Sequence, residues 1–341
     1  MNRSIDCDAS HRSTLLDRKV YATFCEGEGF DLAGLCLELL TEQKKTWQDL
    51  REGYEAFKEV RERDLPCTGF SVRLQHNLGR IKSSAAITGA NTDERNCFLC
   101  LDHLPQDQKG ILYRGDYLIL CNPRPIFSHH FTVTHLDHRR QAIAGHTDTL
   151  LQLASDFGPA WTVLYNGPRC GASAPDHMHL QITPSGQMPI EKEIKEERRR
   201  SLAMRMKGVF LYRLQDLGRE AILLEGGDPV AVGVAFKRLA EGLKNVLLID
   251  EEPMINVMGC WEEGRWHLVV FPRRRHRPDV FFREGDARMV VSPGVIDMGG
   301  VLVTPREKDF KRLDAAWVKT IFGEVSMDGE TIERTFRVLA G

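Results

Sequence analysis

The sequence predicts an α+β fold in which two duplicated halves follow one another, each built from an antiparallel sheet with flanking helices. Two observations predict this fold. The order strand, strand, helix, strand, strand can be traced between residues 117 and 184, and again between residues 209 and 272. In addition, a chain of 341 residues is long enough for two ordinary domains or for one duplicated unit.

Helical spacing of apolar residues marks the segment before the first half. Leucines between residues 32 and 40 recur on one helical face, and an amphipathic pattern continues to Arg63. Pro66 and Gly69 end this pattern, and alternation over residues 70–74 indicates a strand. We therefore expect a helical extension over residues 1–66, a catalytic half over residues 67–190 and a degenerate half over residues 205–341.

Each half repeats the same elements. In the second half, Asp228 followed by Pro229 is a typical helix start, with a capping side chain and then a first-turn proline. The run over residues 191–200 is dense in both charge signs and predicts a solvated helical connector between the halves. The expected strands cover residues 117–120, 131–133, 161–165 and 177–182 in the first half, and 209–212, 221–224, 254–258 and 266–271 in the second.

Composition narrows the class of protein. A net charge of -2 gives no general attraction to nucleic acid or to anionic membranes, and no apolar run approaches the roughly 20 residues of a membrane span. The first 17 residues are polar and show no secretory signal. Nine cysteines, most of them scattered singly, are typical of a reduced chain. We expect a cytoplasmic protein without a nucleic-acid or membrane partner, and the oligomeric state stays open.

The most informative segment is His177-Met178-His179-Leu180-Gln181. Because side chains alternate along a strand, His177, His179 and Gln181 are expected on one face, with the two apolar residues on the other. A row of polar groups is costly to bury unless each has a partner, and a metal and a phosphate would be suitable partners. Upstream, residues 166–173 form a loop without bulky side chains, which either lets backbone amides approach an anion or simply forms a turn.

The segment over residues 165–181, YNGPRCGASAPDHMHLQ, resembles the active-site segment of the transferase branch of the histidine-triad superfamily. That branch includes galactose-1-phosphate uridylyltransferase, diadenosine tetraphosphate phosphorylase and GDP-galactose phosphorylase. The hydrolase branch has a third histidine at the position of Gln181. The resemblance implies that His179 attacks the α-phosphorus and holds the nucleotidyl group, while Gln181 donates a hydrogen bond to a non-bridging phosphate oxygen.

Further binding residues are implied by the same resemblance. On the loop side, Asn166, Gly171 and Ser173 are expected to bind phosphate. The segment over residues 75–86, QHNLGRIKSSAA, resembles a strand that runs along the nucleotide in these phosphorylases, which makes Arg80 a phosphate or base contact, although an ordinary surface arginine is the alternative. Asn122 falls where the superfamily places a ribose contact.

A CxxC motif, Cys97-Phe98-Leu99-Cys100, is by itself compatible with a redox pair, half of a metal site or coincidence. The resemblance to the uridylyltransferase implies that Cys97, Cys100, His138 and His177 bind one zinc ion. Two cysteines and two histidines fill all four positions of a tetrahedral site, so such a zinc would be structural. The alternative is a pair of thiols without zinc.

The second half shows less of this chemistry. Its strand over residues 265–272 retains a single histidine, His267, so we expect no nucleotidyl transfer of its own. The basic run Arg273–Arg277 predicts either a contact to substrate phosphate or a solvated hairpin.

Together these features predict a nucleotidyltransferase or phosphorylase. It would move a nucleoside monophosphate, AMP or GMP, from a dinucleoside polyphosphate or nucleotide-sugar to inorganic phosphate or a phosphorylated acceptor such as a sugar phosphate. The neutral imidazole of His179 would serve as nucleophile and then as leaving group. The alternatives are a nucleotide pyrophosphate hydrolase of the same fold and a non-catalytic, zinc-stabilised nucleotide-binding protein.

Overall fold

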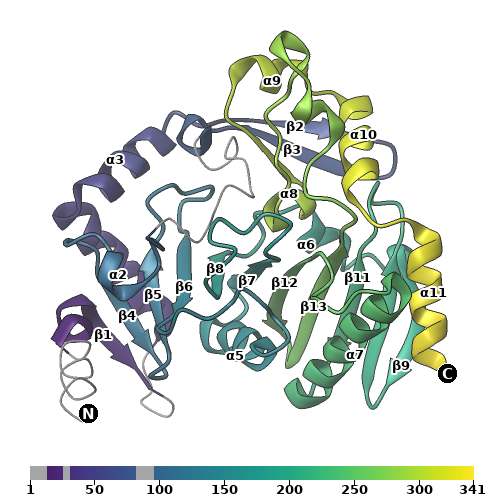
Figure 1. Cartoon of the computed structure of the whole chain (residues 1–341), viewed down its shortest axis with the longest axis horizontal. Coiled ribbons are helices and arrows are strands. Elements are labelled where there is room, and N and C mark those ends of the chain that lie inside the picture. The colour runs from purple at the N-terminus through teal and green to yellow at the C-terminus, as the bar shows by residue number, and fades with distance from the viewer. Residues whose placement is uncertain (1–13, 26–30, 82–95) are drawn as a thin grey trace.

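The computed structural model describes residues 14–25, 31–81 and 96–341 (Figure 1). Within these residues an eleven-stranded sheet runs across the molecule in the order β1-β4-β5-β6-β8-β7-β12-β13-β11-β10-β9. A three-stranded sheet, β14-β3-β2, lies apart from it. The strands are β1 (Val20–Phe24), β2 (Arg61–Pro66), β3 (Ser71–His76), β4 (Gly110–Tyr113), β5 (Tyr117–Cys121), β6 (Phe131–His135), β7 (Trp161–Asn166), β8 (His179–Pro184), β9 (Arg200–Met206), β10 (Val209–Leu214), β11 (Ile222–Gly226), β12 (Ile255–Glu262), β13 (Arg265–Pro272) and β14 (Val301–Thr304).

Helices flank the sheets, and the predicted α+β fold is confirmed. The α-helices are α2 (Leu32–Thr46), α3 (Gln48–Phe57), α5 (Thr147–Phe157), α6 (Ile190–Glu193), α7 (Pro229–Leu247), α8 (Val295–Met298), α9 (Glu307–Arg312), α10 (Ala315–Val325) and α11 (Gly329–Ala340). The start of α7 is as predicted, since the Asp228 carboxylate accepts a hydrogen bond from the Val230 amide and Pro229 is the first helical residue.

The two halves have the same order of elements and share one sheet. Strands β5 and β6, helix α5, and strands β7 and β8 correspond to β10, β11, α7, β12 and β13. The halves meet where β7 pairs antiparallel with β12, with Asn166 opposite Asn256 and Tyr165 opposite Val257. This edge-to-edge pairing brings the second half directly beside the strands that carry the predicted site.

Each face of the large sheet is covered by a different layer. One face packs Tyr165 and Leu180 against helix residues such as Leu150 and Phe236. On the other face, Leu164, Met258 and Phe271 belong to a second core cluster, together with the segment over residues 280–325 and the small sheet. The second face also carries the predicted site residues, as the alternation along β8 requires.

Two sequence-based expectations need correction, and two others are not decided by the structure. The helical pattern expected to continue to Arg63 ends at Phe57, because residues 61–66 pair with β3 as strand β2. The connector over residues 191–200 is not simply solvated, since Glu191, Glu193 and Arg199 are buried. The domain boundaries at 66, 190 and 205 stay a prediction, and the part of the QHNLGRIKSSAA segment after Ile81 lies outside the described residues.

Among the residues described, none of the helices combines the length and apolarity required to cross a membrane.

Candidate active site

The alternation along β8 places the predicted nucleophile and amide on one face of the sheet. Met178 and Leu180 are fully buried in the core on the helix side. His179, which pairs with Thr134 of β6, and Gln181 therefore point to the opposite face. Asn166, the last residue of β7, points to that same face because its neighbour Tyr165 lies in the helix-side core.

One ring nitrogen of His179 is left available for chemistry. Its Nδ1 lies 2.9 Å from the carbonyl oxygen of His177, which can only accept, so Nδ1 carries the proton and donates. Nε2 is then unprotonated, and it is buried without a hydrogen-bond partner among the described residues. Burial lowers the pKa of the His179 imidazole to about 4, which keeps the ring neutral. The arrangement leaves the lone pair of Nε2 on the side of the ring away from the His177 carbonyl.

A buried glutamine that the sequence analysis missed holds the backbone of this histidine. The Gln141 Oε1 accepts a hydrogen bond of 2.8 Å from the His179 amide, and Nε2 donates to the carbonyls of His179 (3.1 Å) and Asn166 (2.9 Å). The β7–β8 ladder ends at the Leu164–Gln181 pair, so the side-chain amide of Gln141 takes the place of further ladder bonds. Gln141 follows β6 in an irregular segment, where no periodic pattern could have revealed it.

The amide of Gln181 is oriented by His130, which is completely buried. His130 Nδ1 accepts from the Ile126 amide at 3.2 Å, so the ring proton is on Nε2 and donates to Gln181 Oε1 at 2.7 Å. Burial, together with the nearby charge of Arg80, lowers the pKa of His130 to about 4, so this neutral tautomer is kept at neutral pH. With its oxygen engaged, Gln181 presents its NH2 group as a donor.

The loop between β7 and β8 is tightly packed where it turns. Gly171 has a φ of +117°, a conformation that side chains disfavour, and a Cβ there would lie 2.9 Å from Gly294 Cα. Ser173, two residues later, is exposed. The backbone conformation and the close packing therefore require glycine at position 171. The phosphate contacts predicted for Gly171 and Ser173 stay predictions.

Arg80 and Asn122 lie on two segments that contact each other. Arg80 ends the short turn after β3, and its Nη1 donates to the Arg124 carbonyl at 3.0 Å. The positive charge of Arg80 is one cause of the lowered pKa of His130. Asn122 Oδ1 accepts from the Arg124 amide at 2.9 Å, so this side chain closes a turn; its ribose contact stays a prediction.

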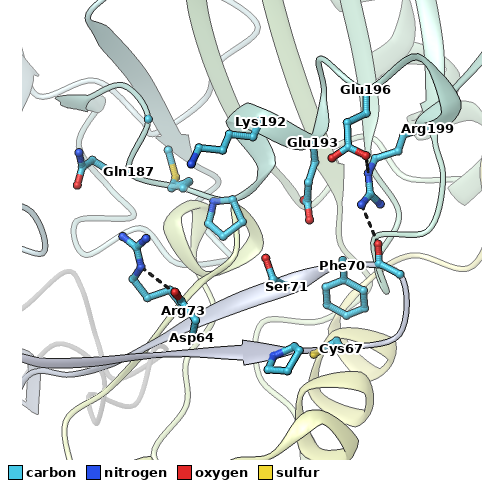
Figure 2. Close-up of a pocket in the computed structure, with 15 residues that line it drawn as sticks. Asp64, Cys67, Phe70, Ser71, Arg73, Gln187, Lys192, Glu193, Glu196 and Arg199 are labelled. Atoms are coloured by element: carbon cyan, nitrogen blue, oxygen red, sulfur yellow. Dashed lines mark hydrogen bonds and ion pairs between the residues drawn. The ribbon is translucent and has the colours of Figure 1, made fainter.

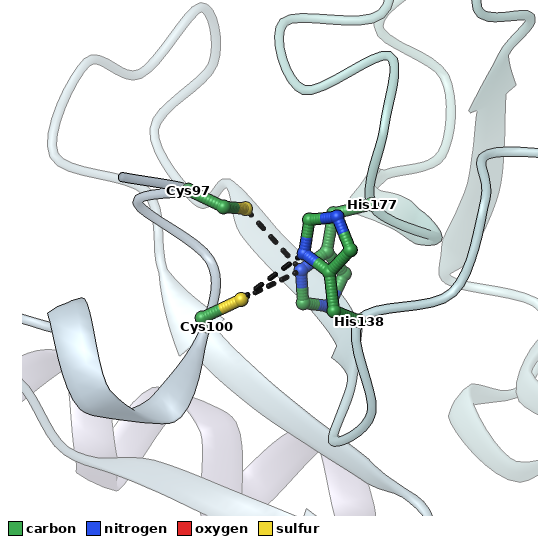
Figure 3. A group of neighbouring side chains, drawn as sticks. All are labelled: Cys97, Cys100, His138 and His177. Atoms are coloured by element: carbon green, nitrogen blue, oxygen red, sulfur yellow. Dashed lines mark hydrogen bonds between the residues drawn. The ribbon is translucent and has the colours of Figure 1, made fainter. Parts of the chain in front are cut away.

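The four predicted metal ligands are brought together from distant parts of the chain (Figure 3). Their ligand atoms all lie within 4.8 Å of one another. Sγ of Cys97 is 3.3 Å from Nδ1 of His177, and Sγ of Cys100 is 3.1 Å from Nδ1 of His138. Neighbouring ligands of a tetrahedral zinc ion lie roughly 3.3–3.8 Å apart, given Zn–S and Zn–N bonds of about 2.3 and 2.0 Å.

The outer nitrogens of both histidines also have suitable partners. His177 Nε2 lies 2.8 Å from the His135 carbonyl, and His138 Nε2 lies 3.6 Å from the Asp176 carboxylate. Such partners fix the tautomer that leaves Nδ1 free to bind a metal. The cluster of Cys97, Cys100, His138 and His177 can therefore hold a metal ion.

The second half has no comparable pair of imidazole and amide in its described strands. His267 lies 3.8 Å from the Glu225 carboxylate, and Val269 and Phe271 are buried in the core. Both expectations for the basic run are wrong for Arg273, which is 1% exposed and donates to the Pro293 carbonyl. A buried guanidinium with protein partners is neither a solvated hairpin nor a free phosphate ligand.

A separate polar cleft of about 560 Å³ lies between the β2–β3 hairpin and residues 186–199 (Figure 2). Arg73 Nε lies 3.4 Å from the Asp64 carboxylate. Arg199 forms an ion pair of 2.9 Å with Glu196 and donates to the Gly69 carbonyl. Because these charges are paired within the protein, we assign no ligand to this cleft.

Comparisons with known proteins agree with this architecture. Residues 39–184 match a family model described as a domain of unknown function (DUF4922), and residues 193–339 match the model "GDPGP1-like, C-terminal domain". Yeast Ap4A phosphorylase Apa2 in complex with AMP is 17% identical, with a TM-score of 0.56 over 87% of this chain and 96% of its own. The same enzyme in complex with Ap4A gives 13% identity and a TM-score of 0.54, over 83% and 97% of the two chains. No curated protein matches the sequence.

The chain thus has the fold of yeast Ap4A phosphorylase, and the predicted resemblance is confirmed at the level of the fold. Its overall arrangement is similar to that of Ap4A phosphorylase, and its second half matches the GDPGP1-like C-terminal domain model.

Proposed function

We propose that this protein is a nucleotidyl-transferring phosphorylase in which His179 is the covalent nucleophile. The observation that carries the proposal is the buried Nε2 of His179, which has a free lone pair and no described partner. It lies on the same face as the amides of Gln181 and Asn166. The fold shared with Ap4A phosphorylase supports the same class of reaction.

The first step forms a bond between His179 Nε2 and the α-phosphorus of the donor. The bond from that phosphorus to its bridging oxygen breaks, and the remainder of the donor leaves with the electron pair. Positive charge that develops on the ring is stabilised by the hydrogen bond from Nδ1 to the His177 carbonyl. The NH2 group of Gln181 would donate to a non-bridging oxygen, where donors stabilise the charge of the transition state.

The second step returns the enzyme to its starting state. An oxygen of inorganic phosphate or of a phosphorylated acceptor attacks the same phosphorus, and the N–P bond breaks with its electrons returning to Nε2. Splitting one displacement into two in this way gives ping-pong kinetics. Since Gln181 stands where a hydrolase would have a third histidine, no imidazole at that position could carry a proton to or from water.

We also infer that the metal of the Cys97–Cys100–His138–His177 site is zinc. Two thiolates and two imidazoles in a tetrahedral arrangement are a set that zinc favours. All four positions are filled by protein atoms, so the metal would supply structure. It would hold His177, whose carbonyl accepts a hydrogen bond from His179 Nδ1, and in this way it would fix the orientation of the nucleophile.

A donor panel tests the proposed function. The protein is incubated with ADP- and GDP-linked sugars and with dinucleoside polyphosphates, with and without inorganic phosphate, and its intact mass is measured. We expect a nucleotidyl adduct with at least one donor, and product formation that requires phosphate or another acceptor. Equal turnover in the absence of any added acceptor would identify a hydrolase instead, and no adduct with any donor would identify a binding protein.

His130→Phe tests whether the orientation of the Gln181 amide matters. Phenylalanine fills a similar volume but cannot donate to Gln181 Oε1, so we expect adduct formation to slow by about 10-fold. Leaving two buried polar groups unpaired should also reduce the free energy of unfolding by about 1–3 kcal/mol. Single-turnover kinetics and thermal denaturation measure the two effects. His130→Gln, which can still donate, should recover part of the rate; equal rates for His130→Phe and the native protein would contradict the role.

A further inference from the structure

We propose that Asn256 and Arg273, both from the half without a nucleophile, are positioning residues for nucleotidyl transfer because they fix Asn166 as a hydrogen-bond donor. The inference rests on the proposed function of His179. A row of buried polar side chains runs from Arg273, after β13, across Asn256 of β12 to Asn166 at the end of β7.

The row begins with a group that can only donate. The Arg273 guanidinium donates through Nε to the Val325 carbonyl (3.2 Å) and through Nη2 to the His276 carbonyl (2.9 Å). Its Nη1 donates to the Pro293 carbonyl at 2.9 Å and also to Asn256. Because a guanidinium has no acceptor, the Asn256 atom that faces it must be the amide oxygen.

The orientation of Asn256 then determines what faces the first half. With Oδ1 toward Arg273, its Nδ2 donates to Asn166 Oδ1 at 2.8 Å and to the Cys170 carbonyl at 2.7 Å. Both hydrogens of this NH2 group are used. The bond to the Cys170 carbonyl also fixes the position of the loop just before Gly171.

Two donors therefore converge on one oxygen of Asn166. The Val295 amide, at the start of α8, donates to Asn166 Oδ1 at 2.7 Å, beside the bond from Asn256. With the oxygen held in this way, the Asn166 NH2 group is turned away from Asn256. That NH2 group makes no hydrogen bond to any residue in the described ranges 14–25, 31–81 and 96–341.

The free NH2 group belongs to a residue that is closely tied to the nucleophile. Asn166 shares a sheet face with His179, and Gln141 bonds to the backbone of both. His130 orients the Gln181 amide by the same logic, with a fixed donor behind the oxygen. The site would thus have two amide donors, Gln181 and Asn166, each with its oxygen fixed by a hydrogen bond. Donors that are oriented before the reaction stabilise the charge that develops on phosphate oxygens.

Asn256→Asp is the sharpest test of this inference. An aspartate can still accept from Arg273, but its second oxygen would face Asn166 Oδ1, so Asn166 is expected to turn and present its carbonyl to the substrate. We expect the single-turnover rate of nucleotidyl-His179 formation to fall by roughly 10²-fold. The dissociation constant of the donor should change by less than about 3-fold, since the lost interaction is made mainly in the transition state.

Two further variants separate positioning from a general structural defect. Arg274→Met removes the neighbouring arginine, which is exposed and donates to the Gly323 carbonyl, and should keep the native rate. Asn166→Ala removes the donor itself, and adding Asn256→Asp to it should slow the reaction by no more than about 2-fold further, because the two changes abolish one interaction. Circular dichroism and thermal denaturation establish that each variant is folded, with Asn256→Ser as the substitute if Asn256→Asp is not.

The outcomes distinguish this inference from the proposed function. If the native protein forms no adduct, the function of His179 is contradicted. If the native protein forms the adduct, a native rate in folded Asn256→Asp, or losses that add fully with those of Asn166→Ala, would overturn the role of Asn256 and Arg273 alone.

Discussion

Replacing His179 with alanine is expected to abolish the nucleotidyl adduct and to lower kcat by at least about 10⁴-fold. The reason is that no neighbouring side chain can take its place. Of the histidines closest along the chain and the sheet, His177 has both ring nitrogens directed at other partners, and His130 uses its two nitrogens to bind the Ile126 amide and Gln181. Without Nε2 of His179 the reaction would need direct attack by the acceptor, which the two-step chemistry avoids.

The measurement is rapid-quench kinetics with a donor labelled at the α-phosphate, combined with intact-mass analysis. His129→Ala is a matched control, because His129 is a partly exposed histidine whose Nδ1 forms a hydrogen bond with the hydroxyl of the neighbouring Ser128. It should form the adduct at the native rate. A His179→Ala protein that still carried label after quenching would show that another residue is the nucleophile, and peptide mapping would identify it.

The second large effect is expected when the metal site is broken. Cys97→Ala should abolish stoichiometric zinc binding and reduce the free energy of unfolding by several kcal/mol, because metal binding energy contributes directly to folding. For a protein of this size we expect Tm to fall by about 10 °C. Adduct formation should slow as well, since His177 links the metal site to the Nδ1 proton of His179.

Metal content by elemental analysis and Tm by calorimetry check this prediction. Cys25→Ser serves as the control, since Cys25 is exposed and lies outside the cluster. It should retain about one zinc per chain and the native Tm. Native protein that contains no zinc after growth in zinc-supplemented medium, and that has the same Tm as Cys97→Ala, would show that the four residues form a metal-free cluster of thiols and imidazoles.

Several features of the site could be predicted from short stretches of sequence. The alternation of His179 and Gln181 with Met178 and Leu180 is a property of any β-strand, so the sequence is sufficient to place the first two residues on one face. The start of α7 is equally local, because Asp228 caps the helix it precedes. The four metal ligands were predicted from a resemblance in motif and order, and they do lie together.

Other features depended on which segments meet in the folded chain. Residues 61–63 continue an amphipathic helical pattern, yet residues 61–66 form a strand because β3 offers an edge and β14, more than 200 residues later, completes the sheet. Arg273 lies in a run of basic residues that is typical of a solvated surface, but the C-terminal segment covers it with carbonyl groups.

The sequence by itself therefore determined the repeated order of elements in the two halves, the face of β8 that carries the chemistry and the residues available to bind a metal. Only the tertiary structure decided how the reacting groups are oriented. His130 fixes the orientation of the Gln181 amide, and Asn256 fixes that of the Asn166 amide. Gln141 fixes the position of the His179 backbone. The physical reason is that strand alternation is a local property of the backbone. The orientation of a side-chain amide instead depends on the hydrogen-bond donor that binds its oxygen. That donor comes from another strand or from the other half of the chain.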